Sequence, residues 1–159
     1  QMAMENMDTP TALIFSRQNV KSLPEGTDYQ QTRKGAYIVT GSDEQFDVIL
    51  VASGSEVSTC VAGAELLRKD GVKVRVVSAP SEGLFRRQSK EYQEQILPRD
   101  AKIFGLTAGL PVTLEGLVGA NGKVFGLNSF GFSAPYTVLD EKLGFTPENV
   151  YKQVKAFLA

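Results

Sequence analysis

Histidine and tryptophan are absent from this chain of 159 residues, and cysteine occurs once, as Cys60. Without histidine the chain cannot form a Ser-His-Asp triad, a Cys-His pair or a His-ligated metal site. A single cysteine can form neither an internal disulfide nor a cysteine-cluster zinc site. Chemistry in this chain must therefore use carboxylates, lysine or a cofactor, or must lie in another part of a larger protein.

A strong excess of charge and long apolar runs are also missing. The net charge is −1, so the sequence predicts no general surface for nucleic acid or for anionic membranes. No apolar run approaches the roughly 20 residues that span a bilayer, and no charged-then-apolar leader opens the sequence. Cys60 falls on the apolar face of a predicted helix, which indicates a buried, reduced thiol. We therefore expect a cytoplasmic protein of about one domain that binds neither nucleic acid nor membrane.

The clearest pattern lies between Asp47 and Ser81. The apolar run Val48–Ala52 predicts a strand that is covered on both faces. Apolar residues then recur at helical spacing, which predicts a helix. Gly71 follows at the position where a helix commonly ends with a residue in the left-handed conformation. A second β-branched run, Val72–Val77, follows. Because so short a crossover requires parallel strands with the helix across one sheet face, the fold class is α/β.

Weaker signals on both sides of this unit complete the predicted fold. Four further strands are expected at 11–15, 35–39, 102–106 and 123–127, and short helices at 89–96 and 112–118. Two more helices are expected, one with Ser133 as its N-cap and ending at Gly144, the other with Thr146 as its cap and Pro147 in its first turn. We expect a three-layer α/β/α sandwich with a mostly parallel sheet of about five strands. Residues 1–19 are interpreted as the last helix and strand of a preceding domain, 20–34 as a linker and 35–159 as the domain itself.

Gly54-Ser55-Glu56 is a candidate binding loop because it lies at the carboxyl end of a parallel strand and at a helix N-terminus. Open α/β sheets bind ligands at that edge, and free N–H groups there favour anions. The glycine pattern is neither that of a dinucleotide-binding loop nor that of a P-loop. The favoured interpretation is structural, with Ser55 capping the helix and Glu56 interacting with its dipole.

Arg17 is a second candidate because it ends the predicted strand 11–15, and a guanidinium presents paired donors that suit phosphate. Arg86 and Arg87 are expected in a loop that is solvated or faces a partner. Glu115 is an isolated carboxylate with no partner that would make it a general acid or base. Other predictions are structural: Asp140 and Glu141 on the wet face of their helix, and Phe125, Phe130 and Phe132 in the core or a subunit contact.

Several segments resemble transketolases. Residues 9–19, TPTALIFSRQN, are similar to the family's "PTALxxSRQN", and 51–57, VASGSEV, to its "VATGSEV". Residues 74–81 resemble "VRVVSMPS", 130–135 "FGxSAP" and 144–150 "GFTxENV". These segments follow the family's order and cover nearly the whole chain, so together they are specific.

The resemblance implies a fold, an activity and a role for the chain. Transketolases transfer a two-carbon ketol unit between sugar phosphates in the pentose phosphate pathway, and they act as homodimers. The chain resembles a fragment that holds the C-terminal domain and is inactive alone. Thiamine diphosphate and a divalent metal, Mg²⁺ or Ca²⁺, would bind between upstream domains, so no catalytic, cofactor or metal residue is assigned here. The arginine of the SRQN motif contacts the substrate phosphate in the family, and Arg17 occupies that place.

The sequence departs from the family pattern at three places: 79–85, 106–108 and 127–131. The family uses these stretches for subunit contacts, so the resemblance does not define the dimer surface. Two alternatives stay open. One is the C-terminal domain of a related thiamine enzyme, either deoxyxylulose phosphate synthase or a dehydrogenase E1 subunit. The other is a free-standing module that binds an anion at Gly54-Ser55-Glu56.

Overall fold

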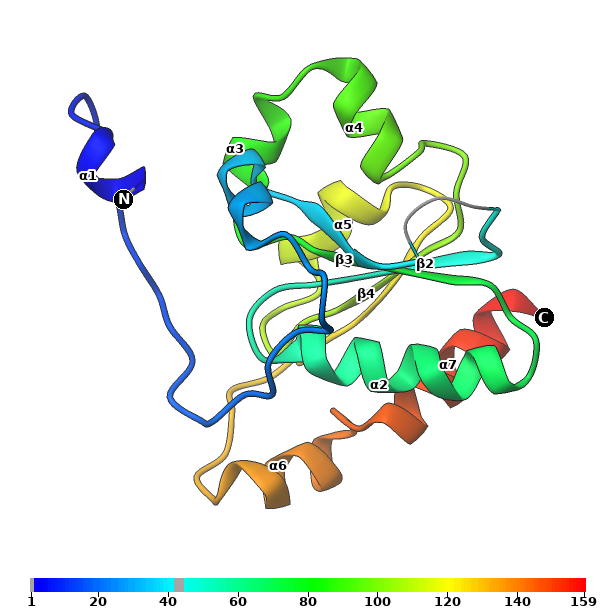
Figure 1. The fold of residues 1–159 in the computed structure, drawn as a ribbon. Coiled ribbons are helices and arrows are strands. Elements are labelled where there is room, and N and C mark those ends of the chain that lie inside the picture. Colours follow the sequence, from blue (N-terminus) through cyan, green and yellow to red (C-terminus); the bar gives the residue numbers. More distant parts are fainter. Residues whose placement is uncertain (1, 42–44) are drawn as a thin grey trace.

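A computed structural model describes residues 2–41 and 45–159 of the chain. Within these residues five strands form one sheet, in the order β1-β3-β2-β4-β5. Figure 1 shows helices on both sides of this sheet, which confirms the predicted α/β sandwich. The strands are β1 (Tyr37–Thr40), β2 (Val48–Ala52), β3 (Val74–Ser78), β4 (Ile103–Leu106) and β5 (Lys123–Phe125).

The centre of the sheet is parallel, as the short crossover requires. β2 pairs in parallel with β3 on one side and with β4 on the other, and β5 continues the parallel order at one edge. β1 is antiparallel to β3 and forms the opposite edge. The carboxyl ends of β2, β3, β4 and β5 therefore share one edge of the sheet, where α/β proteins place their ligands.

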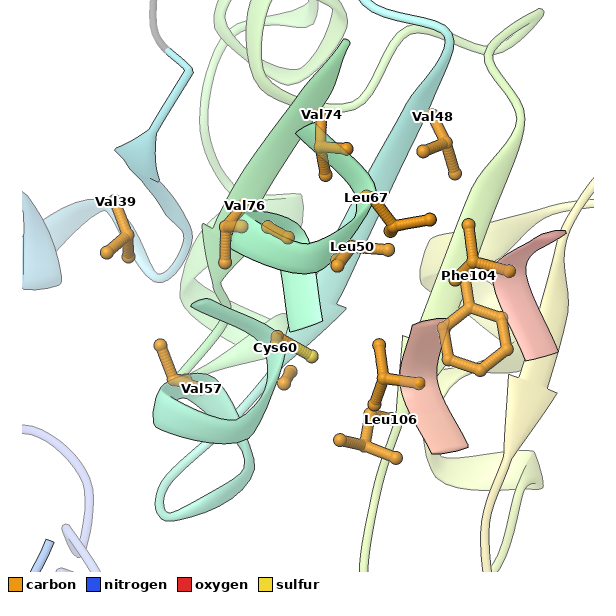
Figure 2. Close-up of a cluster of buried hydrophobic side chains, with 14 of the residues drawn as sticks. Val39, Val48, Leu50, Val57, Cys60, Leu67, Val74, Val76, Phe104 and Leu106 are labelled. Carbon is orange, nitrogen blue, oxygen red and sulfur yellow. The ribbon is translucent and has the colours of Figure 1, made fainter. Parts of the chain in front are cut away.

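Two apolar clusters, one on each face of the sheet, form the core. β2 contributes to both because its side chains alternate: Val48 and Leu50 belong to one cluster, Ile49 and Val51 to the other. All four side chains are fully buried, which confirms the strand predicted from the continuous apolar run. Figure 2 shows the first cluster, where Cys60 and Leu67 of one helix lie over Leu50, Val76 and Phe104 of the sheet.

The helices divide between the two faces (Figure 1). α2 (Glu56–Lys69) and α7 (Pro147–Leu158) cover the first cluster. The opposite face is covered by α3 (Glu82–Arg86), α4 (Lys90–Ile96) and α5 (Val112–Val118), which pack on the second cluster. α3 was not predicted, since a helix of five residues with an internal glycine has no periodic signal of its own.

α2 ends as predicted, with Gly71 at a φ of 78°, in the left-handed region that glycine adopts without a steric cost. In the middle of α2, Gly63 allows α7 to approach closely. A Cβ built at Gly63 would lie 2.7 Å from Cγ1 of Val150. This contact brings Val150 and Val154 of α7, both almost fully buried, against the sheet cluster.

For the last two helices, one predicted N-cap is confirmed and the other is wrong. Thr146 caps α7 as predicted, because its hydroxyl accepts a hydrogen bond of 3.3 Å from the Asn149 N–H. α6 (Tyr136–Leu143) ends at Gly144 as predicted, but Ser133 is not its N-cap. Pro135 has an extended ψ of 139°, and a residue that precedes proline avoids the helical region, so the helix begins only at Tyr136.

The N-terminal part differs most from the sequence prediction. α1 (Met2–Glu5) confirms a short helix, but residues 11–15 do not form a strand in the described structure. Leu13, Ile14 and Phe15 are exposed, and Ile14 reaches 94%. A strand needs a neighbour for its backbone hydrogen bonds, and no described strand lies beside this run. A 3₁₀ helix, η1 (Tyr29–Lys34), occupies the end of the predicted linker.

None of the helices within residues 2–41 and 45–159 has both the length and the apolar character needed to span a membrane.

Candidate functional site

The candidate site lies at the carboxyl edge of the sheet, where β2 passes into α2. Two adjoining cavities flank the turn there, with volumes of about 460 and 360 Å³. Ser55 and Glu56 line both of them. Residues 14–16 line the larger cavity and residues 18–21 the smaller one. The N-terminal segment therefore passes over the start of α2.

Arg17, the predicted phosphate-binding residue, lies between these two groups of lining residues and is exposed. Its neighbour Gln18 is half-buried, whereas the rest of residues 4–22 is exposed. Ser16 lies close to the turn, with its hydroxyl oxygen 3.8 Å from the position of a Cβ built at Gly54. The structure thus brings Arg17 to the same edge of the sheet as Gly54-Ser55-Glu56, the other candidate of the sequence prediction.

Ser55 does not cap α2 in the predicted manner. Its backbone is already helical, and its hydroxyl donates a 2.7 Å hydrogen bond to Oε1 of Glu56 instead of accepting one from the helix. Gly54 has a φ of 64° and forms the turn that leads out of β2. The turn therefore orients the Glu56 carboxyl group over the first turn of α2.

Glu56 is half-buried, and burial raises the pKa of its carboxyl group above the ordinary value. Hydrogen bonds from Ser55, the Ala108 N–H and its own N–H lower the pKa, but less than burial raises it. The negative charge of Asp140 adds a further rise. Because Glu56 lies at the helix start and accepts a hydrogen bond from its own N–H, a free anion there would meet a carboxylate.

Asp140 was predicted on the wet face of its helix, and that prediction is wrong. The residue is partly buried, lines the same 360 Å³ cavity as Glu56, and burial raises the pKa of its carboxyl group. No residue of α6 is fully buried, so the helix has no strong periodic pattern. The approach of Asp140 to Glu56 joins residues 84 positions apart, and nothing in the local sequence indicates it. Glu141 is exposed, as predicted.

The remaining charged candidates take no part in this site. Arg86 lies in α3, not in a loop, and forms an ion pair of 2.6 Å with Glu82 and a hydrogen bond of 3.0 Å to the Gly116 carbonyl. Arg87 is exposed directly after α3. Glu115 is exposed on α5, on the other face of the sheet from α2, and shows no neighbour of the kind that acid-base catalysis needs.

The three phenylalanines divide into two groups. Phe125 packs edge-to-face with Phe145, with ring centroids 5.6 Å apart, and belongs to the periphery of the first cluster. Phe130 and Phe132 are exposed, to 97% and 65%. They lie between β5 and α6, and their exposure places them outside the core of the described structure.

The described residues do not fit thiamine diphosphate or a divalent metal. They contain no group of three or more His, Cys, Asp or Glu side chains that could hold a metal ion. The start of α2 is the natural place for a diphosphate at this sheet edge, but Glu56 occupies it with Asp140 nearby. A diphosphate there would be repelled, so no step of cofactor chemistry is derived for this chain.

Comparison with known proteins identifies the family. Residues 35–146 match the model of the transketolase-like TK C-terminal domain. The chain is 44% identical over 159 residues to a transketolase of Staphylococcus epidermidis, covering 98% of this chain and 24% of that protein. It is 42% identical over 161 residues to transketolase 2 of Vibrio parahaemolyticus, covering 100% of this chain and 24% of the relative.

A crystal structure of transketolase from Pichia stipitis in complex with sedoheptulose-7-phosphate superposes with a TM-score of 0.81 at 32% identity. The match covers 89% of this chain and 20% of that one. The chain thus spans about a quarter of the length of the curated relatives it matches. The matched domain model and these relatives together show that the chain belongs to the transketolase family and carries its C-terminal domain.

Proposed function

We propose that this chain serves a transketolase that transfers a two-carbon ketol unit from a ketose phosphate to an aldose phosphate. The chain supplies structure and one substrate contact, and the carbon chemistry takes place elsewhere in the enzyme. The observation that carries this proposal is the position of Arg17. It lies in the segment that resembles the family's SRQN motif, exposed beside the cavities at the carboxyl edge of the sheet.

Arg17 is proposed to bind the phosphate group of the sugar phosphate. A guanidinium can donate two parallel hydrogen bonds to a phosphate, which fixes the orientation of the substrate as well as holding its charge. The Pichia stipitis relative, described in complex with a sugar phosphate, supports this substrate class. We propose that thiamine diphosphate, which stabilises the carbanion of the ketol unit, and its Mg²⁺ or Ca²⁺ bind outside this chain.

Exposed apolar residues support a role in assembly. The run Leu13–Phe15 is apolar and exposed, as a strand would be whose neighbour lies in another part of the enzyme. Phe130 and Phe132 form a second exposed apolar segment. We propose that the first packs on the preceding domain, of which residues 1–19 would be the end. The second would contact the other subunit of a homodimer in the cytoplasm.

The competing functions have less support. An anion-binding module would use the start of α2, where the Glu56 and Asp140 carboxyl groups oppose an anion. A related thiamine enzyme, such as deoxyxylulose phosphate synthase or a dehydrogenase E1 subunit, would share the fold. The relatives named above are, however, transketolases that match nearly the whole chain.

The test is a hybrid enzyme. The matching C-terminal part of the Staphylococcus epidermidis transketolase is replaced by this chain, and ketol transfer is measured with thiamine diphosphate and Mg²⁺. We expect the hybrid to be active and the chain alone to be inactive under the same conditions. Ketol transfer by the isolated chain would refute the proposal. So would a hybrid that folds as a dimer and binds thiamine diphosphate but transfers nothing.

A further inference from the structure

The stretch between the N-terminal segment and β1 divides into two unlike parts. Residues 19–22, here called the joint, are exposed. Within the described chain, no hydrogen bond or ion pair involves any residue from 12 to 23. Residues 23–34, here called the strap, are different, because several of them are half-buried and make hydrogen bonds. The linker that the sequence predicts at 20–34 therefore contains a bound part and an unbound part.

Leu23 attaches the beginning of the strap to the domain. Its side chain is half-buried and packs on the first apolar cluster, which α2 and α7 cover. Pro24 beside it is also half-buried, whereas residues 19–22 immediately before it are exposed. Lifting the strap would return the apolar surface of Leu23 to water, and that costs free energy in proportion to the exposed area.

Thr27 holds the middle of the strap. Its N–H and its hydroxyl group both donate to the Pro24 carbonyl, over 3.1 and 2.7 Å. Gly26 has a φ of 85°, as the third residue of a type II turn requires. The Thr27 hydroxyl also lies 3.5 Å from the Val39 carbonyl of β1, and the pairing of β1 with β3 shifts its register around that residue. Thr27 therefore closes the turn and joins it to the edge strand.

The end of the strap lies against α3 and α4. Figure 1 shows η1 beside α3. Nζ of Lys34 lies 4.4 Å from the centroid of the Tyr92 ring of α4. The Gly35 carbonyl accepts a hydrogen bond of 3.0 Å from the Ser81 N–H, and a Cβ built at Gly35 would overlap the backbone of Phe85. The strap is therefore attached at its beginning, its middle and its end.

Contacts on the other side of the joint are weaker. Glu5 of α1 forms an ion pair of 3.1 Å with Arg33, but both side chains are about half exposed, at 51% and 47%. An ion pair in that environment contributes little to stability. Ser16 approaches Gly54 without a hydrogen bond. The segment that carries Arg17 is therefore less firmly attached than the strap.

We propose that the strap is a fixed part of this domain, held by Leu23 and Thr27, and that the joint is the hinge on which the segment carrying Arg17 moves. Exposed residues without hydrogen bonds change their backbone angles with little loss of contact, whereas the strap cannot leave without exposing Leu23. From residue 17 to residue 23 the chain spans at most about 20 Å, so the hinge keeps Arg17 near the domain. A hinge between two domains rests on the proposed function, whereas the hold on the strap does not.

Trypsin tests this division, because it cleaves after Lys21 in the joint and after Arg33 and Lys34 in the strap. These are called the joint bond and the two strap bonds. The cleavage rate of each bond in the complete chain is followed by mass spectrometry and divided by its rate in a synthetic peptide of residues 10–40. When opening is fast compared with cleavage, this ratio reports the population of the open segment. We expect the ratio for the joint bond to exceed that for each strap bond by about 30-fold or more.

L23A and T27A are the informative variants. Losing the apolar contact or the hydroxyl group should each accelerate normalised cleavage of the strap bonds by about five-fold or more. The joint bond should stay within about two-fold, since it is already exposed. Cleavage after Lys152 in α7 reports unfolding of the whole domain and should stay unchanged.

Two further variants are matched controls. V20A shortens an exposed apolar side chain in the joint, so it controls for L23A and should leave the strap bonds unchanged. T27S keeps the hydroxyl group and should restore the strap-bond rates of the unaltered chain.

Four results would overturn the proposal. They are strap bonds that are cut as readily as the joint bond in the unaltered chain, strap-bond rates that L23A and T27A leave unchanged, an equal rise in V20A and T27S, and a rise that cleavage after Lys152 matches. The last would show that Leu23 and Thr27 act on the whole domain and not on the strap. The experiment contains neither substrate nor cofactor, so an inactive hybrid enzyme would refute the proposed function alone.

Discussion

At the scale of single residues, close contact and charge burial decide what each position tolerates. Gly63 is the clearest steric case, because α2 and α7 meet over it. A Cβ there would lie 2.7 Å from Cγ1 and 3.0 Å from Cβ of Val150, and Val150 is almost fully buried. Val150 cannot move away without disturbing the sheet cluster, so the missing side chain at Gly63 is required for helix packing.

We predict that G63A lowers the free energy of unfolding by about 1 kcal/mol. Alanine gains helix propensity of roughly 1 kcal/mol, but overpacking in a core typically costs about 1–3 kcal/mol. G83A is the matched control, since a Cβ at this exposed glycine in α3 has no heavy atom within 4 Å. It should stabilise the chain by about 0.5–1 kcal/mol. Urea unfolding measures both, and a G63A variant as stable as the unaltered chain would show that α7 does not pack here.

Glu56 is the corresponding case for charge. Because burial raises the folded-state pKa of Glu56 above its ordinary value, folding disfavours the charged form of the carboxyl group relative to the neutral form. The stability that this preference contributes is complete below about pH 4.5 and is lost as the pH rises through the folded-state pKa. E56Q keeps the shape and the neutral state at every pH.

We therefore predict that E56Q is more stable than the unaltered chain at pH 7, and that the difference disappears towards pH 4. Urea unfolding at a series of pH values measures this difference, with E65Q as the control for loss of a surface charge on the same helix. A destabilised E56Q at pH 7 would contradict the assigned effect of burial.

At the scale of elements, the starts of α6 and α7 show which helix boundaries the local sequence determines and which it does not. Thr146 caps α7 through a hydrogen bond of 3.3 Å from the Asn149 N–H, whereas Ser133 is not the N-cap of α6. We predict that T146A costs about 1 kcal/mol of stability, the usual cost of a lost cap. S133A should change stability by less than about 0.5 kcal/mol. Thermal unfolding of the two variants side by side measures this, and equal effects would show that the capping assignment is wrong.

The elements that the sequence predicted well are those whose signals are local. β2 and α2 follow from a continuous apolar run and a helical repeat, and Gly71 marks the end of α2 by its own conformational freedom. The prediction of a strand at 11–15 was wrong because a strand depends on a partner that is not local in the sequence. Its apolar pattern is present, but a strand exists only through a partner, and the described chain provides none.

The candidate site shows the same division. Arg17 and Gly54-Ser55-Glu56 could be named from the sequence, because strand ends and helix starts mark the ligand edge of a parallel sheet. The sequence could not show that these two candidates lie close to each other, because only the packing of the N-terminal segment brings residue 17 near residue 56. Asp140 was misjudged because partial burial by another helix leaves no trace in the repeat of α6.

At the scale of the whole molecule, the chain is a parallel α/β domain with an exposed segment across its ligand edge (Figure 1). Its core consists of two apolar clusters, one on each face of the sheet. Its described residues hold no cluster that could bind a catalytic metal. Under the proposed function, this domain contributes structure and the phosphate contact of Arg17.

The most direct test of this account is the kinetics of R17A in the hybrid enzyme with a phosphorylated and an unphosphorylated ketose donor. Losing a charge-assisted contact should raise KM for the ketose phosphate about 10- to 100-fold and leave the unphosphorylated donor unchanged within about two-fold. R17K, which keeps the charge but not the paired donors, should lie between R17A and the unaltered hybrid. An equal loss with both donors, or no loss with either, would contradict the role assigned to Arg17.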